Sequence, residues 1–384
     1  MKKIAIKLYM MMIQILGFVF GRFPVQQKVV MLISFPENPT AVLREMDKLH
    51  FTPETIVFYD PRMNVDGMSR NFMRSLPKTK ANLIRLMFHL STAKVVVTDN
   101  YFAELAGVKW RENMTCVQIW HANGALKKFG WEDKAAQKRS ESDKKRFQAV
   151  YQTFSKVLVG SDEMGDIFKR SFLLDDARLL KLGVPRTDYY FDEATLALNK
   201  QIGLEKYGIN GKKVLLYAPT FRDEALSETK LALDIAAMKQ ALGEEYKLLL
   251  KVHPSMVSDL EKIQDNFCVY ADKETEIEAL LPMTDVLITD YSSIPFEFSF
   301  FEKPMIFFAY DLEEYDGNRG LADHYLETIP GPLCKTTAEV IEAVQNPAVD
   351  LEQIRAFGAK WNKYSDGESS KRFVDFLQVE LDRE

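Results

Sequence analysis

The sequence predicts an α/β protein built from two doubly wound domains. Its 384 residues exceed what a single hydrophobic core usually organises, so two domains are expected. Short runs of apolar, often β-branched residues alternate with helical patterns, which is typical of parallel sheets covered by helices on both faces. The series starts again near residue 190, and we therefore place the first domain at residues 24–188 and the second at residues 189–384.

Each predicted strand is a continuous apolar run. In the first domain the expected strands are residues 29–33, 54–59, 95–97, 117–120 and 157–159. In the second domain the expected strands are residues 214–217, 247–252, 286–288 and 305–308. A turn-forming segment at residues 183–188 lies between the two series and is the expected hinge.

The two domains carry similar strand ends. A Val-Thr-Asp-Asn-Tyr sequence places Asp99 directly after one strand, and an Ile-Thr-Asp-Tyr-Ser sequence places Asp290 after another. Ligands of open α/β sheets bind beyond the carboxyl ends of the strands, so both positions are expected to lie near a binding site. Chance similarity of so short a pattern is the alternative interpretation.

Composition argues against several classes of function. The net charge is −5, which gives no general attraction to nucleic acid, and we expect no nucleic-acid partner. The three cysteines are far apart, which argues against a disulfide framework and for a reducing compartment. The sequence contains no Cys/His cluster with zinc spacing, no EF-hand loop and no Walker loop, so we expect neither a metal site nor another cofactor.

The first 23 residues form a separate feature. Two lysines precede an apolar stretch at residues 4–20, and Lys3, Lys7 and Gln14 fall on one helical stripe. An amphipathic helix that lies in the membrane interface, with its lysines near anionic headgroups, fits this pattern best. A signal peptide would need a small-residue cleavage site, and a transmembrane span usually needs about 20 apolar residues. A buried helix of the first domain is the main alternative.

The segment after Asp290 has the residues of a phosphate site. Ser292 and Ser293 precede an expected helix start, and Pro295 suits the first turn of that helix. The free N–H groups at a helix N-terminus attract phosphate, and hydroxyl groups there add further donors. In the alternative interpretation the two serines only cap the helix.

Two other strand ends of the second domain carry basic side chains. Lys251 and His253 end one strand, where an imidazole can donate to a phosphate oxygen or protonate a leaving group. Arg222 follows another strand, and its guanidinium group can bind a diphosphate through two nitrogens. A polar loop at residues 318–324 is a candidate to close over a donor. A structural histidine, a surface ion pair and a solvated loop are the corresponding alternatives.

His121 is the main candidate for catalysis in the first domain. It follows a strand, and imidazole is a suitable general base because its pKa lies near working pH. Asn123 and Gly124 permit a tight turn after it. Residues 127–146 are rich in lysine and arginine, which indicates an anionic partner such as a membrane or a lipid diphosphate. A solvated helix face is the alternative interpretation of this basic segment.

These motifs, in this order, resemble those of the CDP-glycerol glycerophosphotransferases of wall teichoic acid synthesis, and the resemblance covers nearly the whole chain. The segments that carry it are Trp-His-Ala-Asn-Gly-Ala-Leu-Lys-Lys-Phe-Gly at 120–130, Tyr-Ala-Pro-Thr-Phe-Arg-Asp at 217–223, Lys-Val-His-Pro at 251–254, Thr-Asp-Tyr-Ser-Ser at 289–293 with Phe-Glu at 296–297, Asn-Arg-Gly at 318–320 and Trp-Asn-Lys-Tyr-Ser-Asp-Gly at 361–367. Within the family, the chain length and the Lys-Lys-Phe-Gly sequence most resemble the enzymes that prime the polymer.

The resemblance implies a GT-B-type architecture, in which two Rossmann-like domains face a cleft, the last helix often crosses back to the first domain and a metal is usually absent. It implies that the second domain binds CDP-glycerol. The first domain would bind an undecaprenyl-diphosphate-linked disaccharide of N-acetylglucosamine and N-acetylmannosamine. The enzyme would be peripheral on the cytoplasmic face of the cell membrane, and would transfer one glycerol phosphate and release CMP.

The resemblance also implies roles for matching residues. The expected catalytic residues are His121 and His253. The expected donor-binding residues are Thr220, Arg222, Lys251, Asp290, Ser292, Ser293, Glu297, Arg319 and Asp323. The expected acceptor-binding residues are Asp99, Asn123, Lys127 and Lys128. From its position at a strand end, Asp99 is also a candidate to orient His121 or the acceptor.

Other functions fit parts of the sequence. A second-step or polymerising glycerol- or ribitol-phosphate transferase of the same family would extend a lipid that is already primed. A nucleotide-sugar glycosyltransferase or epimerase on the same fold would release a uridine nucleotide. A regulatory protein with a decayed site would release no product. The nucleotide released from each donor therefore distinguishes these functions.

Overall fold

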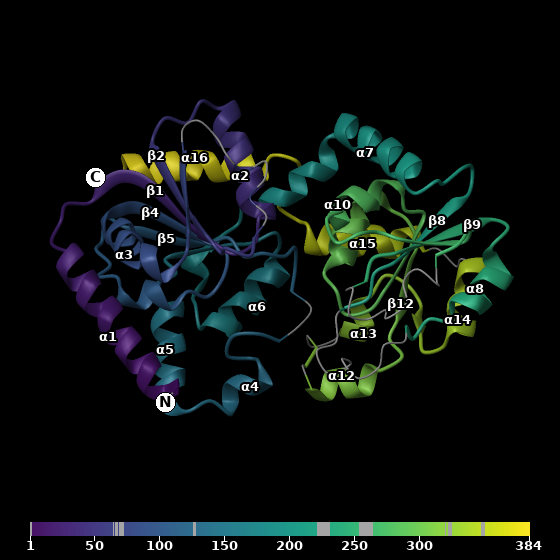
Figure 1. Ribbon diagram of the computed structural model, residues 1–384, viewed down its shortest axis with the longest axis horizontal. Coiled ribbons are helices and arrows are strands. Elements are labelled where there is room, and N and C mark those ends of the chain that lie inside the picture. The colour runs from purple at the N-terminus through teal and green to yellow at the C-terminus, as the bar shows by residue number, and fades with distance from the viewer. Residues whose placement is uncertain are drawn as a thin grey trace. The chain divides into compact units, whose positions relative to one another are not determined.

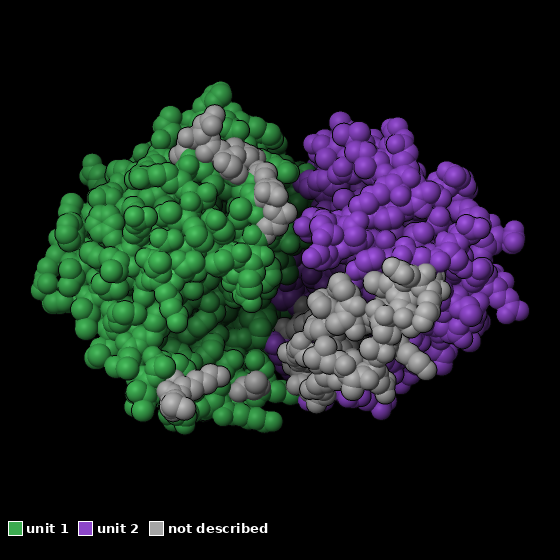
Figure 2. Space-filling view, viewed as in Figure 1, with its two compact units in different colours: residues 1–122, 129–188, 362–384 green, residues 123–128, 189–361 purple. Residues whose placement is uncertain are grey.

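The chain is described by a computed structural model at residues 2–63, 65, 68, 73–125, 128–220, 231–252, 264–318, 320–321, 325–346 and 350–384 (Figure 1). Its internal contacts divide it into two compact units (Figure 2). Unit 1 comprises Met1–Ala122, Phe129–Asp188 and Asn362–Glu384. Unit 2 comprises Asn123–Lys128 and Tyr189–Trp361.

Unit 1 is built on a parallel sheet that has seven strands within the described residues. Their order is β3-β2-β1-β4-β5-β6-β7, and every neighbouring pair runs parallel. The strand order reverses between β1 and β4, which makes their carboxyl ends the topological switch point of a doubly wound sheet. The strands are β1 (Gln26–Ile33), β2 (Glu54–Tyr59), β3 (Met73–Pro77), β4 (Ala93–Thr98), β5 (Thr115–Gln118), β6 (Lys156–Leu158) and β7 (Leu179–Leu180).

Helices cover both faces of the unit 1 sheet (Figure 1). α2 and α16 pack side by side on one face, where their apolar residues share a core with β1, β4 and β5, and α3 packs on β1 and β4. The helices are α1 (Lys2–Phe20), α2 (Glu37–Lys48), α3 (Leu83–Thr92), α4 (Lys134–Gln137), α5 (Glu141–Tyr151), α6 (Asp162–Phe172) and α16 (Ser369–Asp382). The 3-10 helices are η1 (Lys80–Asn82), η2 (Ala103–Gly107), η3 (Asp176–Arg178) and η4 (Pro185–Phe191), the last of which continues into unit 2.

α1 packs on unit 1 through one face only. Ile13 and Gly17 are buried, and a Cβ atom at Gly17 would lie 1.8 Å from the carbonyl oxygen of Gly107, so the backbones of α1 and η2 are in close contact. The Tyr9 hydroxyl donates a hydrogen bond to Glu104 at 2.6 Å. Seven large apolar side chains of the helix are 41% to 64% exposed, and they are Ile4, Leu8, Met11, Met12, Ile15, Phe18 and Val19. Ile6, Met10, Leu16 and Phe20 are half-buried.

The expected N-terminal apolar helix is confirmed, and its burial combines two of the sequence interpretations. One stripe belongs to the packing of unit 1, as the buried-helix interpretation requires. The exposed apolar face is what the interfacial interpretation requires. By length and composition alone, Lys3–Phe20 is also long and apolar enough to cross a membrane.

Unit 2 repeats the topology of unit 1. Its parallel sheet has six strands within the described residues, in the order β10-β9-β8-β11-β12-β13, so β8 and β11 correspond to β1 and β4. The strands are β8 (Lys213–Tyr217), β9 (Tyr246–Leu250), β10 (Cys268–Tyr270), β11 (Val286–Thr289), β12 (Met305–Phe308) and β13 (Leu333–Cys334). The helices are α7 (Glu193–Lys206), α8 (Ile235–Leu242), α10 (Ile277–Leu280), α11 (Ile294–Phe298), α12 (Leu312–Asn318), α13 (Tyr325–Thr328), α14 (Thr337–Gln345), α15 (Leu351–Trp361), and the 3-10 helices η7 (Leu281–Met283) and η8 (Ser299–Phe301).

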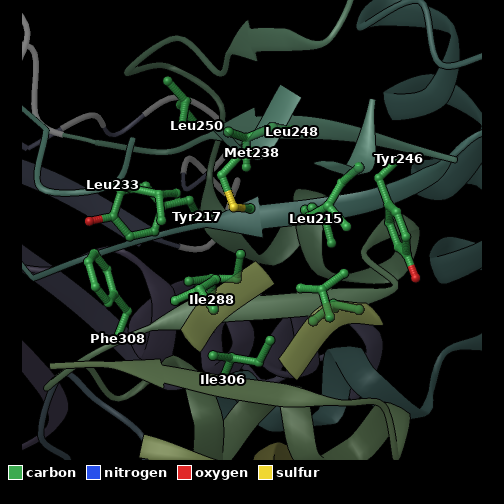
Figure 3. Close-up of a cluster of buried hydrophobic side chains, with 14 of the residues drawn as sticks. Leu215, Tyr217, Leu233, Met238, Tyr246, Leu248, Leu250, Ile288, Ile306 and Phe308 are labelled. Carbon is green, nitrogen blue, oxygen red and sulfur yellow. The ribbon is translucent and has the colours of Figure 1, made fainter. Parts of the chain in front are cut away.

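The core of unit 2 lies between the sheet and its helices. In Figure 3, Leu215 of β8, Leu248 of β9 and Ile288 of β11 meet Met238 of α8 in a cluster of buried side chains. Burying one such side chain stabilises a fold by roughly 1.5–3 kcal/mol, so this cluster holds α8 on the sheet and stabilises the strands whose ends carry the predicted donor-site residues.

The predicted α/β class with two parallel sheets is confirmed, and each of the nine predicted strands is present with small shifts at its ends. The run predicted at 117–120 ends early, at Gln118, because Trp120 has a left-handed φ of +57° that a strand does not accept. The strands that the sequence does not predict are β3, β7, β10 and β13, which form the four edges of the two sheets. β7, β10 and β13 have only two or three residues each, which is too few to be recognised as a strand, and β3 mixes polar with apolar residues.

Candidate active site

The carboxylate of Asp99 organises the switch point of unit 1. Asp99 directly follows β4 and is fully buried. Its oxygens accept hydrogen bonds from the backbone N–H groups of Ser34, at 2.8 and 3.0 Å, and of Phe35, at 2.7 Å. Ser34 and Phe35 follow β1, the neighbouring strand, so Asp99 joins the ends of the two strands on either side of the switch point.

His121 is oriented by the backbone at this point. Its Nδ1 lies 3.0 Å from the carbonyl oxygen of Asp99. A carbonyl oxygen can only accept a hydrogen bond, so Nδ1 carries the hydrogen and Nε2 keeps the lone pair. The geometry therefore leaves Nε2 as the nitrogen that can take a proton from a ligand.

The turn that presents His121 is held from several sides. The Trp120 amide donates to the side chain of Gln118 at 2.9 Å, and the Asn38 side chain donates to the Trp120 carbonyl at 3.0 Å. The guanidinium of Arg186 donates to the His121 carbonyl at 3.3 Å. A left-handed non-glycine residue costs roughly 1–3 kcal/mol, so these bonds maintain a strained backbone directly before the candidate base.

Two aromatic rings lie against the imidazole of His121. The Phe35 ring is stacked on it, with centroids 4.3 Å apart and an interplanar angle of 18°. The Trp120 ring lies at the same centroid distance and at an angle of 31°. Trp120 itself packs against the Phe129 ring, 4.6 Å away, so the His121 side chain has little freedom to rotate.

Burial shifts the protonation of both ionisable groups. Loss of water contact lowers the pKa of His121; the Asp99 carbonyl opposes this shift and the positive charge of Arg186 adds to it. Burial also raises the pKa of Asp99 to about 7, although the hydrogen bonds from Ser34 and Phe35 favour the charged form. A neutral imidazole is what a general base needs before it accepts a proton.

The remaining acceptor-binding predictions lie in a segment that belongs with unit 2. Asn123 is buried, and the Lys128 amide donates to the Gly320 carbonyl at 3.2 Å. The predicted first domain, residues 24–188, includes residues 123–128, whereas contact clustering groups this segment with unit 2. Gly124 is packed there against Phe296, because a Cβ atom at Gly124 would lie 2.5 Å from that ring. Lys127 lies outside the described residues.

The basic segment at 127–146 carries its own acidic partners. Ion pairs join Arg139 to Asp133 at 3.6 Å, Lys144 to Glu141 at 2.9 Å and Arg146 to Asp143 at 3.0 Å. Each pair offsets local positive charge, so the structure favours the solvated-face interpretation for these three cations.

Asp290 occupies in unit 2 the place that Asp99 occupies in unit 1. It directly follows β11, is buried, and its carboxylate accepts hydrogen bonds from the amides of Thr220, at 2.7 Å, and Tyr291, at 2.6 Å. Thr220 lies beyond the end of β8, the neighbouring strand. The similar Thr-Asp sequences of the two halves therefore mark equivalent structural positions, and the donor-binding role of Thr220 and Asp290 stays a prediction.

In the part of the chain that the structure describes, the two serines after Asp290 do not make the side-chain capping bond expected at the start of α11. The Ser292 hydroxyl is 2.8 Å from that of Thr289, so it is engaged with the strand end. Ser293 is the N-cap residue of α11, but within the described residues its side chain makes no capping bond, because its φ and ψ of −82° and −4° are helical rather than extended. Pro295 lies in the first turn of α11, as expected.

Two further donor-site predictions lie in unit 2, where Glu297 is buried and Lys251 is half-buried. Glu297 accepts a hydrogen bond from the Tyr190 hydroxyl at 3.2 Å. The Lys251 ammonium donates to the Asp272 carbonyl at 2.7 Å, and burial lowers its pKa. His253, Arg222, Arg319 and Asp323 lie outside the described residues. Among the residues that the structure describes, no cluster of three or more His, Cys, Asp or Glu side chains is arranged to hold a metal ion.

Sequence reasoning misses the residues that hold His121 in place. Phe35 follows the first strand, and Asn38, Gln118 and Arg186 come from three other segments of unit 1. None of them belongs to a recognisable motif. The one usable signal is the position of Phe35 after β1, since β1 and β4 meet at the switch point where ligands bind.

Comparison with known proteins identifies the family. Residues 15–378 match the family described as CDP-glycerol:poly(glycerophosphate) glycerophosphotransferase. The teichoic acid glycerol-phosphate primase of Bacillus subtilis (strain 168) is 38% identical over 356 residues, which are 92% of each chain. The protein of the same name from Bacillus spizizenii (strain ATCC 23059 / NRRL B-14472 / W23) is 34% identical over 373 residues, covering 96% of this chain and 97% of that one.

A solved structure of the wall teichoic acid polymerase TagF superposes on this chain with a TM-score of 0.79, at 23% sequence identity. The match covers 98% of this chain and 96% of the TagF chain, which shows a common fold. The family match covers most of the sequence and agrees with relatives that align over nearly their full length. The chain is therefore a member of the CDP-glycerol:poly(glycerophosphate) glycerophosphotransferase family.

Proposed function

We propose that this enzyme transfers one glycerol phosphate from CDP-glycerol to an undecaprenyl-diphosphate-linked disaccharide, and so primes a teichoic acid chain. Two relatives that align over nearly their whole length are named glycerol-phosphate primases, which supports the priming role. The observation that carries the chemistry is the 3.0 Å contact between His121 Nδ1 and the Asp99 carbonyl, because it leaves Nε2 available as a base.

The proposed reaction is a displacement at phosphorus. A hydroxyl group of the acceptor attacks the phosphorus that bears glycerol, and His121 Nε2 takes the hydroxyl proton. The bond from this phosphorus to the bridging oxygen breaks, and CMP leaves with the electron pair. His253 would donate to the departing phosphate, and Arg222 would offset its charge.

Unit 2 would hold the donor through residues near the ends of β8, β9 and β11. Asp290 fixes the Thr220 amide, so its role would be to shape the loop rather than to touch the diphosphate, which is also negative. Ser292 and Ser293 would supply hydroxyl groups, and Lys251 would supply positive charge. Glu297, Arg319 and Asp323 would complete the donor site. Asn123, Lys127 and Lys128 would bind the acceptor.

The enzyme would act as a peripheral protein on the cytoplasmic face of the membrane, where a lipid-linked acceptor is accessible. The support is α1, whose one face packs on η2 while seven large apolar side chains stay exposed. At 100° per residue, Lys3 and Lys7 lie between these two faces. Lysines at that position would meet anionic headgroups when the apolar face enters the membrane.

A mass assay tests the proposal. Synthetic lipid-linked disaccharide is incubated with a large excess of CDP-glycerol, and both the lipid products and the released nucleotide are measured. We expect CMP and a single added glycerol phosphate, with the primed product a poor acceptor because it carries an added negative charge. A ladder of products, or a preference for primed lipid or CDP-ribitol, contradicts the priming assignment; release of a uridine nucleotide from a sugar donor contradicts the donor class.

A matched pair of variants tests the base. His121→Ala should reduce turnover by about 10²–10⁴-fold while CDP-glycerol still binds, because the donor site is proposed in unit 2. His50→Asn is the control, since His50 is an exposed histidine outside the site and asparagine tolerates its φ of +52°. Near-normal turnover of a folded His121→Ala enzyme removes His121 from the mechanism.

A further inference from the structure

The imidazole of His121 lies between two aromatic rings. The rings of Phe35 and Trp120 are each 4.3 Å from the imidazole centroid, at interplanar angles of 18° and 31°. Two rings this close and this nearly parallel to the same imidazole would overlap if they shared one face of it. They therefore cover opposite faces, and the edge that carries Nε2 is the part of the ring left for a ligand.

The position of each ring is fixed by its backbone, through hydrogen bonds at Phe35 and through a strained conformation at Trp120. The Phe35 amide donates to the buried Asp99 carboxylate at 2.7 Å, and the neighbouring Ser34 hydroxyl accepts from the Asn100 side chain at 3.0 Å. On the other side, Trp120 keeps a φ of +57°, a left-handed conformation that bulky residues rarely adopt. A strained tryptophan next to the candidate base indicates a role for its ring position.

The charge on the imidazole changes during the proposed reaction, and the rings respond to that change. Neutral imidazole gains little from an aromatic face, whereas a cation over such a face is attracted by the negative ring quadrupole. The attraction is larger when water is excluded, and His121 is largely shielded from water, which lowers its pKa. Two covered faces therefore favour the protonated ring over the neutral one, against the cost of burial.

The charged side chains of Asp99 and Arg186, which lie near His121, do not stabilise the protonated imidazole. The Asp99 carboxylate accepts from the Ser34 and Phe35 amides, and only the Asp99 backbone carbonyl meets the imidazole. The Arg186 guanidinium donates to the His121 carbonyl, and its positive charge opposes protonation of the ring.

We propose that Phe35 is a positioning residue for His121, and that Phe35 and Trp120 together stabilise the imidazolium that forms when His121 accepts the proton of the acceptor hydroxyl. The inference rests on the proposed role of His121 as the base. It assigns to the loop after β1 a function in catalysis that its sequence does not reveal.

Fluorinated phenylalanines at position 35 test this directly, because fluorine weakens the ring quadrupole and leaves the ring shape nearly unchanged. The full-length enzyme is made with mono-, di- and trifluorinated phenylalanine at that position. Turnover should fall stepwise with fluorination, and Phe35→Leu should lose between about twofold and 30-fold, the range expected for one cation–π contact. The KM for CDP-glycerol should stay unchanged.

A second measurement separates this inference from the proposed function. The pKa of His121 is measured by NMR on histidine-labelled enzyme, with His121→Gln used to identify its signal. The pKa should fall stepwise along the fluorinated series and in Phe35→Leu, because the charged form loses support. If Phe35 only excludes water, the leucine variant should instead keep or raise the pKa, which overturns the proposal, as does a constant pKa along the series.

Turnover and pKa together identify which idea fails. A stepwise fall in pKa with no fall in turnover shows that the rings stabilise the imidazolium but that its formation does not limit the reaction, which overturns the catalytic part of the inference. Full activity of His121→Ala overturns the proposed base itself, whatever the pKa series shows. Phe35→Tyr is the rescue variant, since it keeps an aromatic face and should retain both the turnover and the pKa of the wild type.

Discussion

His121 Nδ1 contacts the backbone carbonyl of Asp99 at 3.0 Å, while the Asp99 carboxylate accepts from the amides of Ser34 and Phe35. Asp99 thus contacts His121 through its backbone and the loop after β1 through its side chain. The backbone carbonyl selects the tautomer of the base, and the side chain fixes the loop that carries Phe35. Substitution of the side chain leaves the tautomer contact in place, which makes the two roles separable.

The first prediction concerns Asp99→Asn. An asparagine oxygen can still accept from one or both amides, and the carbonyl that faces His121 is unchanged, so we expect turnover to fall by about tenfold or less. His121→Ala should lose about 10²–10⁴-fold in the same assay. NMR of histidine-labelled Asp99→Asn should still show hydrogen on Nδ1 of His121. A loss as large as that of His121→Ala, with the tautomer unchanged, would mean that the Asp99 carboxylate acts in the chemistry itself.

The second prediction concerns stability and pH. Burial raises the pKa of Asp99 to about 7 in the folded chain, above its ordinary value of 3.8, so the folded state binds more protons between these two values. The contribution of Asp99 to stability is therefore fully present below about pH 4 and is lost as pH rises through about 7. The slope is at most about 1.4 kcal/mol per pH unit.

Asp99→Asn removes this titration and provides the comparison. The free energy of unfolding of the wild type, relative to Asp99→Asn, should decrease between about pH 4 and 7 and be constant above that range. Tryptophan fluorescence is a suitable probe, because Trp110, Trp120 and Trp131 belong to unit 1 and only Trp361 belongs to unit 2. A difference that does not depend on pH contradicts the raised pKa.

The inner strands of each sheet can be predicted from the sequence, and the edge strands cannot. Strands β1 and β4 are buried along most of their length and read as continuous apolar runs. β3 and β7 are half-exposed or short, so their sequences resemble loops. The repeated Thr-Asp sequence locates both switch points, because each copy stands at the end of a predicted inner strand.

The contacts around His121 could not be predicted in the same way. A histidine after a strand is a visible candidate, but its partner atom is a backbone carbonyl, which every residue possesses. Phe35 and Arg186 reach His121 from segments about 90 and 65 positions away in the sequence. Such convergence depends on how the strands pair, and the apolar runs predict which segments form strands but not the order of those strands in the sheet.

The third prediction tests the docking of α1. A methyl group at Gly17 would lie 1.8 Å from the Gly107 carbonyl oxygen, so Gly17→Ala must push α1 away from η2. We expect a loss of about 1–3 kcal/mol in stability and faster amide exchange along α1. Gly317→Ala is the control, since a Cβ atom there meets no described atom within 4 Å. Equal exchange in the two variants would show that α1 does not depend on this contact.

The fourth prediction concerns Asp290. Asp290→Ala removes the acceptor for the Thr220 and Tyr291 amides, so the loop after β8 loses its anchor. If this loop shapes the donor site, the KM for CDP-glycerol should rise about 10–100-fold, while the pKa of His121 should not change. Asp285→Ala is a matched control, because Asp285 accepts from the Val214 amide near the opposite end of the same strands. Similar KM values in both variants would place the donor elsewhere.

The last prediction concerns the membrane. Leu8 and Ile15 lie on the exposed face of α1, each 55% exposed, so a Leu8→Gln/Ile15→Gln double variant should fold with unchanged stability. It should bind liposomes more weakly at any salt concentration, because apolar area no longer enters the membrane. A Lys3→Gln/Lys7→Gln variant should lose binding only on anionic liposomes and mostly at low salt, since each lysine contributes about 1 kcal/mol that salt screens. Leu198→Gln, at an exposed leucine of α7, is the control.

The manner of attachment follows from the same helix. If α1 lies in the interface while its Ile13 and Gly17 face stays on η2, alkaline carbonate should release the protein from membranes, and Gly17→Ala should bind differently from the wild type. A helix that crosses the membrane cannot keep that face on the domain, because Tyr9 would have to leave Glu104. Resistance to carbonate, together with wild-type binding by the Leu8→Gln/Ile15→Gln variant, would therefore contradict the interfacial helix.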